Sequence, residues 1–261
     1  MLELPDVERM IDGFAAYATG KTISEVLIDD ETAVDVAPKD AKAFIRGHVL
    51  QAVERHGTFV VVRLRSGKAL IFDMGADGEI YLESQTAPPR ENSRIRLQFA
   101  AGRELRFSSS GKQAEVQLLS EGDSATGILG LDPLSEDFTL EAFHRLSRQH
   151  PRSTLKGLLM NQEVVAGIGN EYADEICFQA GYRPDLRVAD MTEQQLARVH
   201  RYLRRVLRRA TLHWQAAHAD PGWLINYRSP GESCPRCRNR LQSMNLVGRK
   251  TYVCPRCQRA A

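Results

Sequence analysis

Four of the five cysteines in this 261-residue chain form two Cys-x2-Cys pairs with a spacing that suits a metal ion. Cys234 and Cys237 are separated by sixteen residues from Cys254 and Cys257. Four thiolates provide a closed tetrahedral shell for Zn²⁺, which leaves no position for a catalytic water. Two chance pairs in a reducing compartment are the alternative, and the spacing disfavours it. We expect one structural Zn²⁺ that stabilises a hairpin too small to fold alone.

The same segment is strongly basic. Residues 234–259 contain no acidic side chain and seven basic ones, which are Arg236, Arg238, Arg240, Arg249, Lys250, Arg256 and Arg259. A zinc ribbon that only binds protein does not need this excess, whereas contact with phosphates explains it. The segment therefore predicts nucleic-acid binding, with DNA as the expected partner.

A glycine-containing turn, Gly167-Ile168-Gly169-Asn170, precedes a segment with helical periodicity. Glycines allow a tight turn, and the following helix presents N–H groups that can bind a phosphate, with Asn170 as an additional donor. An ordinary helix–helix turn is the alternative. Lys156, near the start of another expected helix, is a further candidate for contact with a nucleic-acid backbone.

The segment 192–210 carries six arginines on an amphipathic pattern, at positions 198, 201, 204, 205, 208 and 209. A solvated helix face is the usual explanation for such a run, and we expect it to apply to at least half of these arginines. Electrostatic attraction of phosphates is the expectation for the others.

The charge is distributed unevenly along the chain. Residues 1–150 contain 17 basic and 24 acidic side chains, whereas residues 151–261 contain 18 basic and 9 acidic ones. A basic half attracts a polyanion. The first residues carry acids where a signal peptide needs bases, and no apolar run is long enough to span a bilayer. We expect a cytoplasmic, nucleoid-associated monomer with no membrane contact.

The elements that position these residues divide into strands and then helices. We expect a short helix over residues 5–19 and a β-sandwich or barrel-like domain over residues 22–119. Hairpins are indicated by 59–64 with 69–72 and by 94–99 with 104–108. Residues 121–132 contain three glycines and are expected to connect the domains.

Helical periodicity begins beyond this connection. Expected helices cover residues 139–149, 154–160, 170–180 and 192–210. Thr192 and Gln195 form a capping box for the last helix, and Gly181 is a helix stop. Cys177 lies in an apolar helical context and is expected to be a core residue.

The chain resembles the formamidopyrimidine-DNA glycosylase/endonuclease VIII-like (Fpg/Nei) family of DNA glycosylase/AP lyases over essentially its full length. The resemblance rests on ELPDVE at residues 3–8, MNQEVVAGIGNEYADE at 160–175, GRKTYVCPRCQ at 248–258 and DPL at 132–134. It implies an α+β multidomain protein. The implied domains are a β-sandwich (1–122), a helix–two-turns–helix domain (123–225) and a four-cysteine zinc-finger hairpin (226–261), with DNA in the cleft.

The resemblance also implies site residues. The family attacks the sugar with an N-terminal amine, normally that of proline after Met removal, and an adjacent glutamate handles protons. Glu3 matches that acid. Lys156, Gly169 and Asn170 match the phosphate-binding region, and Arg249 matches the zinc-finger arginine. The four cysteines match the zinc ligands.

Other positions differ from the family's pattern, and they cluster where chemistry occurs. Leu2 replaces the proline, so the α-amine of Met1 or Leu2 is the remaining candidate nucleophile. Thr58 stands at a lysine position, and Ala76 replaces a methionine that fills the space of the flipped base. Lys112, a candidate DNA contact, and Gln113 replace an arginine and a wedge phenylalanine.

Three hypotheses follow. The first is a DNA-repair protein that recognises damaged, abasic, distorted or single-stranded DNA, with lyase activity weak, altered or lost. The second is an active base-excision glycosylase/AP lyase that uses its α-amine or Glu3. The third is a nucleic-acid adaptor without a role in damage.

Overall fold

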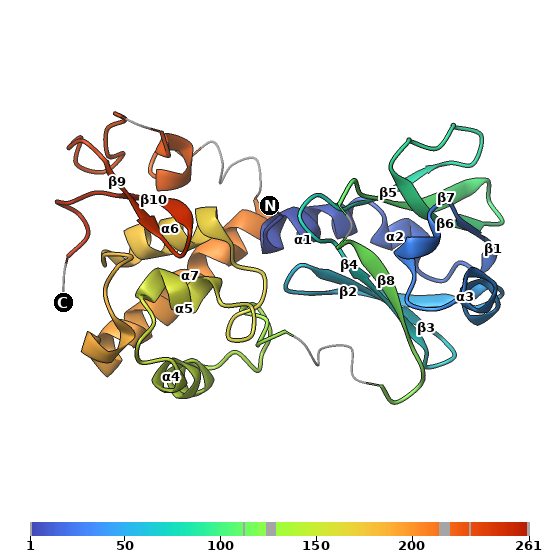
Figure 1. The fold of residues 1–261 in the computed structure, drawn as a ribbon, viewed down its shortest axis with the longest axis horizontal. Coiled ribbons are helices and arrows are strands. Elements are labelled where there is room, and N and C mark those ends of the chain that lie inside the picture. Colours follow the sequence, from blue (N-terminus) through green and yellow to red (C-terminus); the bar gives the residue numbers. More distant parts are fainter. Residues whose placement is uncertain (1, 112, 124–128, 214–219, 230, 260–261) are drawn as a thin grey trace. The chain divides into compact units, whose positions relative to one another are not determined.

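The computed structural model describes residues 2–111, 113–123, 129–213, 220–229 and 231–259 (Figure 1). The chain divides into two compact units. Unit 1 consists of Met1–Leu2 and Asp6–Gly127, and unit 2 consists of Glu3–Pro5 and Ile128–Ala261. The predicted three-domain boundaries stay a prediction.

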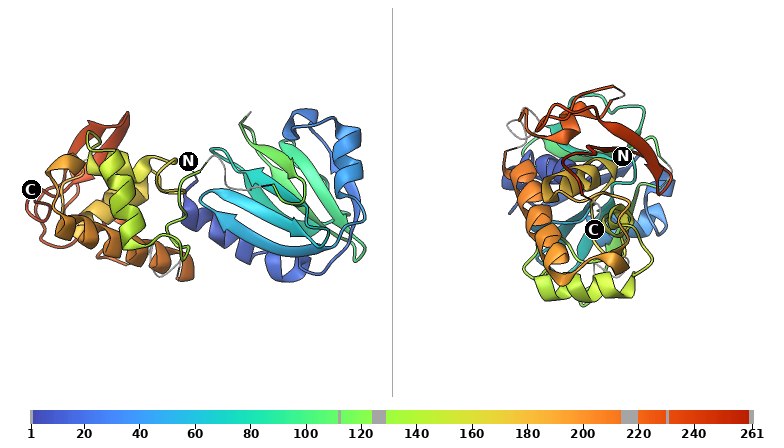
Figure 2. Two further views of the ribbon diagram at one scale, coloured as in Figure 1. Left: turned by 90° about the horizontal axis from the view of Figure 1, so that it is seen from below. Right: turned by 90° about the vertical axis from the view of Figure 1, so that its left-hand side faces the viewer.

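Unit 1 is a sandwich of two four-stranded antiparallel sheets (Figure 2). One sheet has the order β1 (Ile23–Ile28), β6 (Ser93–Phe99), β7 (Arg103–Ser108), β5 (Glu79–Ser84). The other has the order β2 (Leu50–His56), β3 (Phe59–Leu64), β4 (Ala69–Asp73), β8 (Glu115–Leu119). Apolar side chains of both sheets form one core, which includes Val26, Val62, Phe72, Leu97 and Phe107. The predicted sandwich and both hairpins are confirmed.

The helices of unit 1 differ from the prediction. The single helix expected over 5–19 is two helices, α1 (Leu4–Asp12) and α2 (Ala15–Ala18). The sandwich predicted over residues 22–119 also contains a helix, α3 (Pro38–Ile45), and a 3-10 turn, η1 (Glu31–Ala33), which were not predicted. Proline at the first position suits a helix start, and α3 buries only Ala41 and Ile45, which is too few for a clear helical pattern.

Unit 2 contains the four predicted helices, α4 (Leu140–Gln149), α5 (Leu155–Met160), α6 (Asn170–Ala180) and α7 (Glu193–Leu212). Threonine side chains cap three of them, from positions 139, 154 and 192, and the capping box on α7 is present. Gly181 has φ 81° at the end of α6, as expected for a left-handed helix stop. Local capping chemistry therefore sets these boundaries.

The core of unit 2 lies between these helices. The amphipathic pattern predicted over residues 192–210 is confirmed, because α7 buries an apolar stripe in a cluster that also contains residues of α5 and α6. The stripe consists of Leu196, Val199, Leu203, Val206 and Ala210. Cys177 is fully buried in this cluster, as predicted, and burial raises the pKa of its thiol. Short 3-10 turns, η2 (Val188–Asp190) and η3 (Leu224–Tyr227), complete the helical part.

The C-terminal strands of unit 2, β9 (Gln242–Leu246) and β10 (Arg249–Val253), form the predicted antiparallel hairpin. Val247 and Gly248 form its turn, with φ 51° and 66°. Within the described ranges, no helix has both the length and the apolar composition needed to cross a membrane.

Candidate metal centre and nucleic-acid interface

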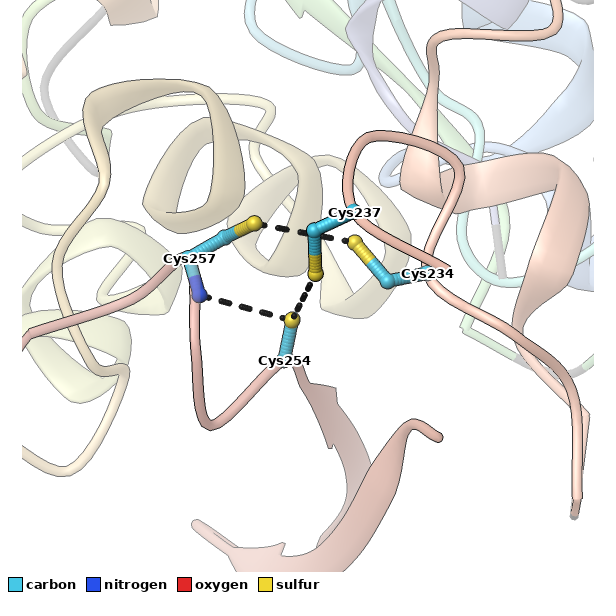
Figure 3. A group of neighbouring side chains, drawn as sticks. All are labelled: Cys234, Cys237, Cys254 and Cys257. Atoms are coloured by element: carbon cyan, nitrogen blue, oxygen red, sulfur yellow. Dashed lines mark hydrogen bonds between the residues drawn. The ribbon is translucent and has the colours of Figure 1, made fainter. Parts of the chain in front are cut away.

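The four predicted metal ligands converge on one point of unit 2. The Sγ atoms of Cys234, Cys237, Cys254 and Cys257 all lie within 4.8 Å of one another (Figure 3). Cys234 Sγ lies 3.8 Å from Cys257 Sγ, and Cys237 Sγ lies 3.5 Å from Cys254 Sγ. A tetrahedral zinc site with Zn–S bonds of about 2.3 Å has S–S edges of about 3.8 Å. The donor set therefore fits one structural Zn²⁺.

Backbone N–H groups orient the sulfurs. The N–H of Arg236 donates to Cys234 Sγ, and the N–H of Cys257 donates to Cys254 Sγ, each with an N–S distance of 3.4 Å. The apolar cluster around the site has five buried members, which are Phe178, Leu224, Cys234, Leu241 and Cys254. Since so small a cluster stabilises little by itself, the metal supplies the cross-link that holds the hairpin.

Glu3 caps helix α6 within unit 2. Its carboxylate accepts hydrogen bonds from the N–H groups of Gly169, Glu171 and Tyr172 at 2.9, 2.8 and 3.1 Å. Only a glycine fits at position 169, because a Cβ atom there would lie 2.6 Å from Glu3 Cδ. The expectation that this turn offers free N–H groups to a phosphate is therefore wrong for these three donors, since Glu3 occupies them.

The same contacts give Glu3 an unusual acidity. Its side chain is buried, and burial raises its pKa to about 7, although the three N–H donors favour the ionised form. A carboxyl group with a pKa in this range can both release and accept a proton near neutral pH. Whether Glu3 has the predicted catalytic role stays a prediction.

Lys156 and Asn170 contact each other. Lys156 Nζ donates to Asn170 Oδ1 at 2.7 Å, to Asp174 Oδ1 at 2.5 Å and to Thr251 Oγ1 at 2.7 Å. Lys156 is completely buried, so its ammonium has no exposed surface in this structure. Burial lowers the pKa of Lys156, and the adjacent Asp174 opposes that shift. Since a lysine can only donate, the oxygen of the Asn170 amide faces it, and the Nδ2 group is left as the donor for another partner.

Asp174 joins three elements and was not identified from the sequence. Besides Lys156, its carboxylate accepts from both Nε and Nη2 of Arg228 and from the N–H of Tyr252 on β10. We call Lys156, Asn170, Asp174, Arg228 and Thr251 the Asp174 cluster. Asn170 and Asp174 are four residues apart, so the helical spacing alone puts both on one face of α6. Arg228 and Thr251 lie in segments with no periodic signal that relates them to α6.

Arg249, the predicted zinc-finger contact, is exposed at the start of β10 and pairs with Leu246 across the hairpin. The hairpin thus presents a basic side chain next to the strand that carries Thr251. A role for Arg249, Asn170, Gly169 or Lys156 in DNA binding stays a prediction.

The positions of unit 1 that differ from the family's pattern lie in or next to loops. Ala76 and Gln113 are exposed and Thr58 is half-buried, while Lys112 and Met1 lie outside the described residues. Leu2 is partly buried and packs against the core of unit 1. Neither the Leu2 nor the Thr58 side chain carries an amine.

A single carboxylate links two of these loops. Asp77 accepts hydrogen bonds from Ser109 Oγ at 2.6 Å, the N–H of Ser110 at 3.0 Å and the N–H of Gly111 at 3.3 Å. The hydrogen bond from Ser109 holds the pKa of Asp77 below its usual value. We call these four residues the Asp77 turn. The Asp77 turn was not predicted from the sequence, because the aspartate and glycine residues of the loop indicate a turn but not its hydrogen-bond partners.

Fold and site together define an α+β protein with an antiparallel sandwich, a helical unit and a four-thiolate zinc hairpin. Three family models match in the same order: the formamidopyrimidine-DNA glycosylase N-terminal domain at residues 1–114, the H2TH domain at 129–217, and the zinc finger found in FPG and IleRS at 231–260. The chain belongs to the formamidopyrimidine-DNA glycosylase family.

Individual relatives agree with this assignment. The chain is 31% identical to the formamidopyrimidine-DNA glycosylase of Halorhodospira halophila over 272 residues, which cover 99% of this chain and all of that protein. It is 29% identical to that of Marinobacter nauticus over a similar span. The crystal structure of the Lactococcus lactis enzyme, bound non-covalently to DNA with an AP site, has a TM-score of 0.86 at 24% identity and covers 98% of this chain and 99% of that one. At this identity the likeness shows the fold.

Proposed function

We propose that this zinc-containing protein binds DNA in base-excision repair and recognises damaged, abasic or distorted sites, with lyase activity weak, altered or lost. The relatives are named as glycosylases, and a solved relative is bound to AP-site DNA. The observation that carries the proposal is the Asp174 cluster, in which the matching residues Lys156 and Asn170 contact each other and Lys156 has a buried partner, while Leu2 and Thr58 replace the amine-bearing residues in unit 1.

The cluster suggests how DNA is contacted. Lys156 fixes the amide of Asn170, and the Asn170 Nδ2 group and the exposed guanidinium of Arg249 are the donors for phosphates. In this arrangement Lys156 neutralises Asp174 and orients Asn170, and a direct contact between Lys156 and a phosphate requires the lysine to leave its buried position. We propose further that the protein acts as a monomer on nucleoid DNA in the cytoplasm.

An active enzyme is the second candidate, and one observation favours it. The pKa of Glu3, raised to about 7 by burial, suits a group that transfers protons at neutral pH. The attacking group is then the α-amine of Met1 or Leu2, or a water activated by Glu3. The α-amine mechanism forms a Schiff base, whereas the water mechanism does not.

Borohydride trapping on abasic-site DNA separates these candidates. A binder gives a retained complex on native gels and no covalent adduct, while an amine-dependent lyase gives an adduct of protein plus DNA. Intact-mass measurement of the same preparation shows which residue carries the amine. Trapping of most of the bound protein as an adduct contradicts the leading proposal, and base release without an adduct supports the water mechanism.

Arg249→Ala tests DNA binding itself. Loss of one phosphate contact should weaken affinity and reduce the slope of log K against log salt by about one unit. Arg152→Ala is the matched control, because Arg152 is also exposed in unit 2 and lies outside the proposed contacts. Unchanged affinity of the Arg249→Ala variant at fixed salt means that the hairpin does not contact DNA.

A further inference from the structure

A hollow of about 190 Å³ in unit 2 is lined by four arginines, three from one helix and one from a cysteine knuckle. Arg198, Arg205 and Arg209 come from α7, and Arg236 comes from the first cysteine knuckle. Gln179, Tyr202, Val206 and Trp223 complete the lining. We call this feature the arginine hollow. The sequence predicted only a basic helix here, and a solvated face was the main expectation for its arginines.

Aromatic rings position the guanidinium groups. Arg236 lies 4.5 Å from the centroid of Phe178, Arg209 lies 5.6 Å from that of Trp223, and Arg198 lies 4.8 Å from that of Tyr202. Guanidinium groups stacked on rings keep their N–H edges available for bidentate contact with an oxyanion. The rings hold these cations in place and are themselves partly covered, with Trp223 only 3% exposed.

Internal partners neutralise only part of this charge. Arg209 forms an ion pair with Asp220, Arg198 Nε donates to Ala180 O at 2.7 Å, and Arg236 Nη2 donates to Gln179 Oε1 at 3.2 Å. Arg205 is exposed, and among the described residues no hydrogen bond or ion pair engages it. Arg201, one turn before Arg205 on α7, is also exposed and extends the basic face. Convergence of like charges costs free energy unless an anion offsets it.

The arginine hollow is distinct from the proposed DNA contacts. Helix α6 has 11 residues, and its first residue is Asn170, whereas Gln179 at its other end lines the hollow. At 1.5 Å per residue this separation is about 14 Å along the helix. A phosphate bound at Asn170 therefore cannot also occupy the hollow.

We propose that the arginine hollow and the adjoining face of α7 bind the phosphodiester backbone of a second nucleic-acid segment. The basic row from Arg198 to Arg209 is about 16 Å long, which suits an extended polyanion rather than a single carboxylate. A protein partner needs an apolar pocket for an anchoring side chain. Here Phe178 and Trp223 are buried, so the polar backbone of a nucleic acid is the occupant that the chemistry favours.

The test is a bridging assay with the full chain. The protein is bound to an immobilised abasic-site duplex, washed, and then exposed to a fluorescent 30-base-pair duplex at low salt. The wild type should capture the second duplex. The double variant Arg201→Glu/Arg205→Glu should lose at least tenfold in capture, while its affinity for the immobilised duplex stays within about twofold. The control Arg145→Glu/Arg152→Glu has the same charge change at exposed sites elsewhere in unit 2 and should capture like the wild type.

Several results overturn the proposal. Absence of capture by the wild type, or equal loss in both double variants, removes the arginine hollow as a specific site. Displacement of the second duplex by a poly-glutamate peptide at a lower concentration than by unlabelled DNA assigns the surface to an acidic protein. The test is separable from the proposed function, because Arg249→Ala should weaken only binding to the immobilised duplex. If the abasic duplex does not bind at all, direct titration of the fluorescent duplex still compares the two double variants.

Discussion

The Asp174 cluster of unit 2 and the Asp77 turn of unit 1 are two polar arrangements with opposite construction. In the first, a completely buried carboxylate accepts from a lysine, an arginine and a backbone N–H on three other segments. In the second, an exposed carboxylate links two neighbouring loops. A buried network leaves an unpaired charge when one member changes, whereas a surface turn exchanges its contacts for water.

This difference agrees with two of the positions at which the chain departs from its family's pattern. Lys156, Asn170 and Glu3, which match that pattern, each have partners inside unit 2 whose burial makes a substitution costly. Ala76 and Gln113 are exposed in loops, where a side chain can change with little effect on folding. Side chains in these loops of unit 1 can therefore change while the buried contacts of unit 2 are retained.

Loss of zinc should have the largest effect and should be confined to unit 2. Cys254→Ser removes one of four thiolates, and apparent binding free energies of structural zinc are on the order of 10 kcal/mol. We expect the C-terminal hairpin to unfold, with zinc content near zero by atomic absorption, and the sandwich of unit 1 to keep its thermal transition. Cys177→Ala is the control, because Cys177 is buried in the helical core and is not a ligand. A Cys254→Ser protein with normal zinc content contradicts the assignment of the site.

Asp174→Asn should destabilise unit 2 by about 3–5 kcal/mol, because it leaves Lys156 and Arg228 without their buried counter-charge. Urea unfolding followed by tryptophan fluorescence measures the change. Asp185→Asn breaks the partly exposed pair with Arg183 and should cost less than about 1 kcal/mol. Equal effects of the two substitutions would mean that the Asp174 cluster stabilises no more than a surface ion pair.

Glu3→Gln tests another buried carboxyl group of unit 2 through pH. The folded-state pKa of Glu3, about 7, lies above its ordinary value of 4.5, so the folded chain binds this proton more tightly than the unfolded chain. The resulting stabilisation is complete below pH 4.5 and is lost as the pH rises through 7, with a limit of about 3 kcal/mol. The free energy of unfolding should therefore decrease less between pH 5 and pH 8 for Glu3→Gln than for the wild type. Parallel curves would refute the raised pKa.

Local signals in the sequence were sufficient for the zinc ligands, the strands of the two hairpins and the helices of unit 2. The cysteine spacing, the threonine caps and the apolar stripe of α7 each act within a few turns of chain. Contacts between distant segments were not predictable in this way. Glu3 and Gly169 are 166 residues apart, and Lys156 and Thr251 are 95 apart, so no periodicity relates them. The prediction of free N–H groups at the glycine turn was wrong for this reason.

Asp77→Ala should have the smallest effect and completes the comparison from the side of unit 1. The substitution removes three hydrogen bonds, but Asp77 and Ser110 are exposed, so water replaces the contact between them. The buried Ser109 Oγ keeps Gly111 O as an acceptor at 3.4 Å and still accepts from the N–H of Gly111 at 3.0 Å. We expect the free energy of unfolding of unit 1 to fall by about 1 kcal/mol or less. Amide exchange should become faster at the N–H groups of Ser110 and Gly111, to which Asp77 is hydrogen-bonded. Hydrogen exchange measured by NMR reports both quantities.

The exposed Asp123→Ala, which removes a local contact to the N–H of Ser120, is the control and should leave exchange at residues 110 and 111 unchanged. A loss as large as that of Asp174→Asn would show that the Asp77 turn is part of the folding core, and the contrast between the two arrangements would no longer explain why the substitutions gather in unit 1.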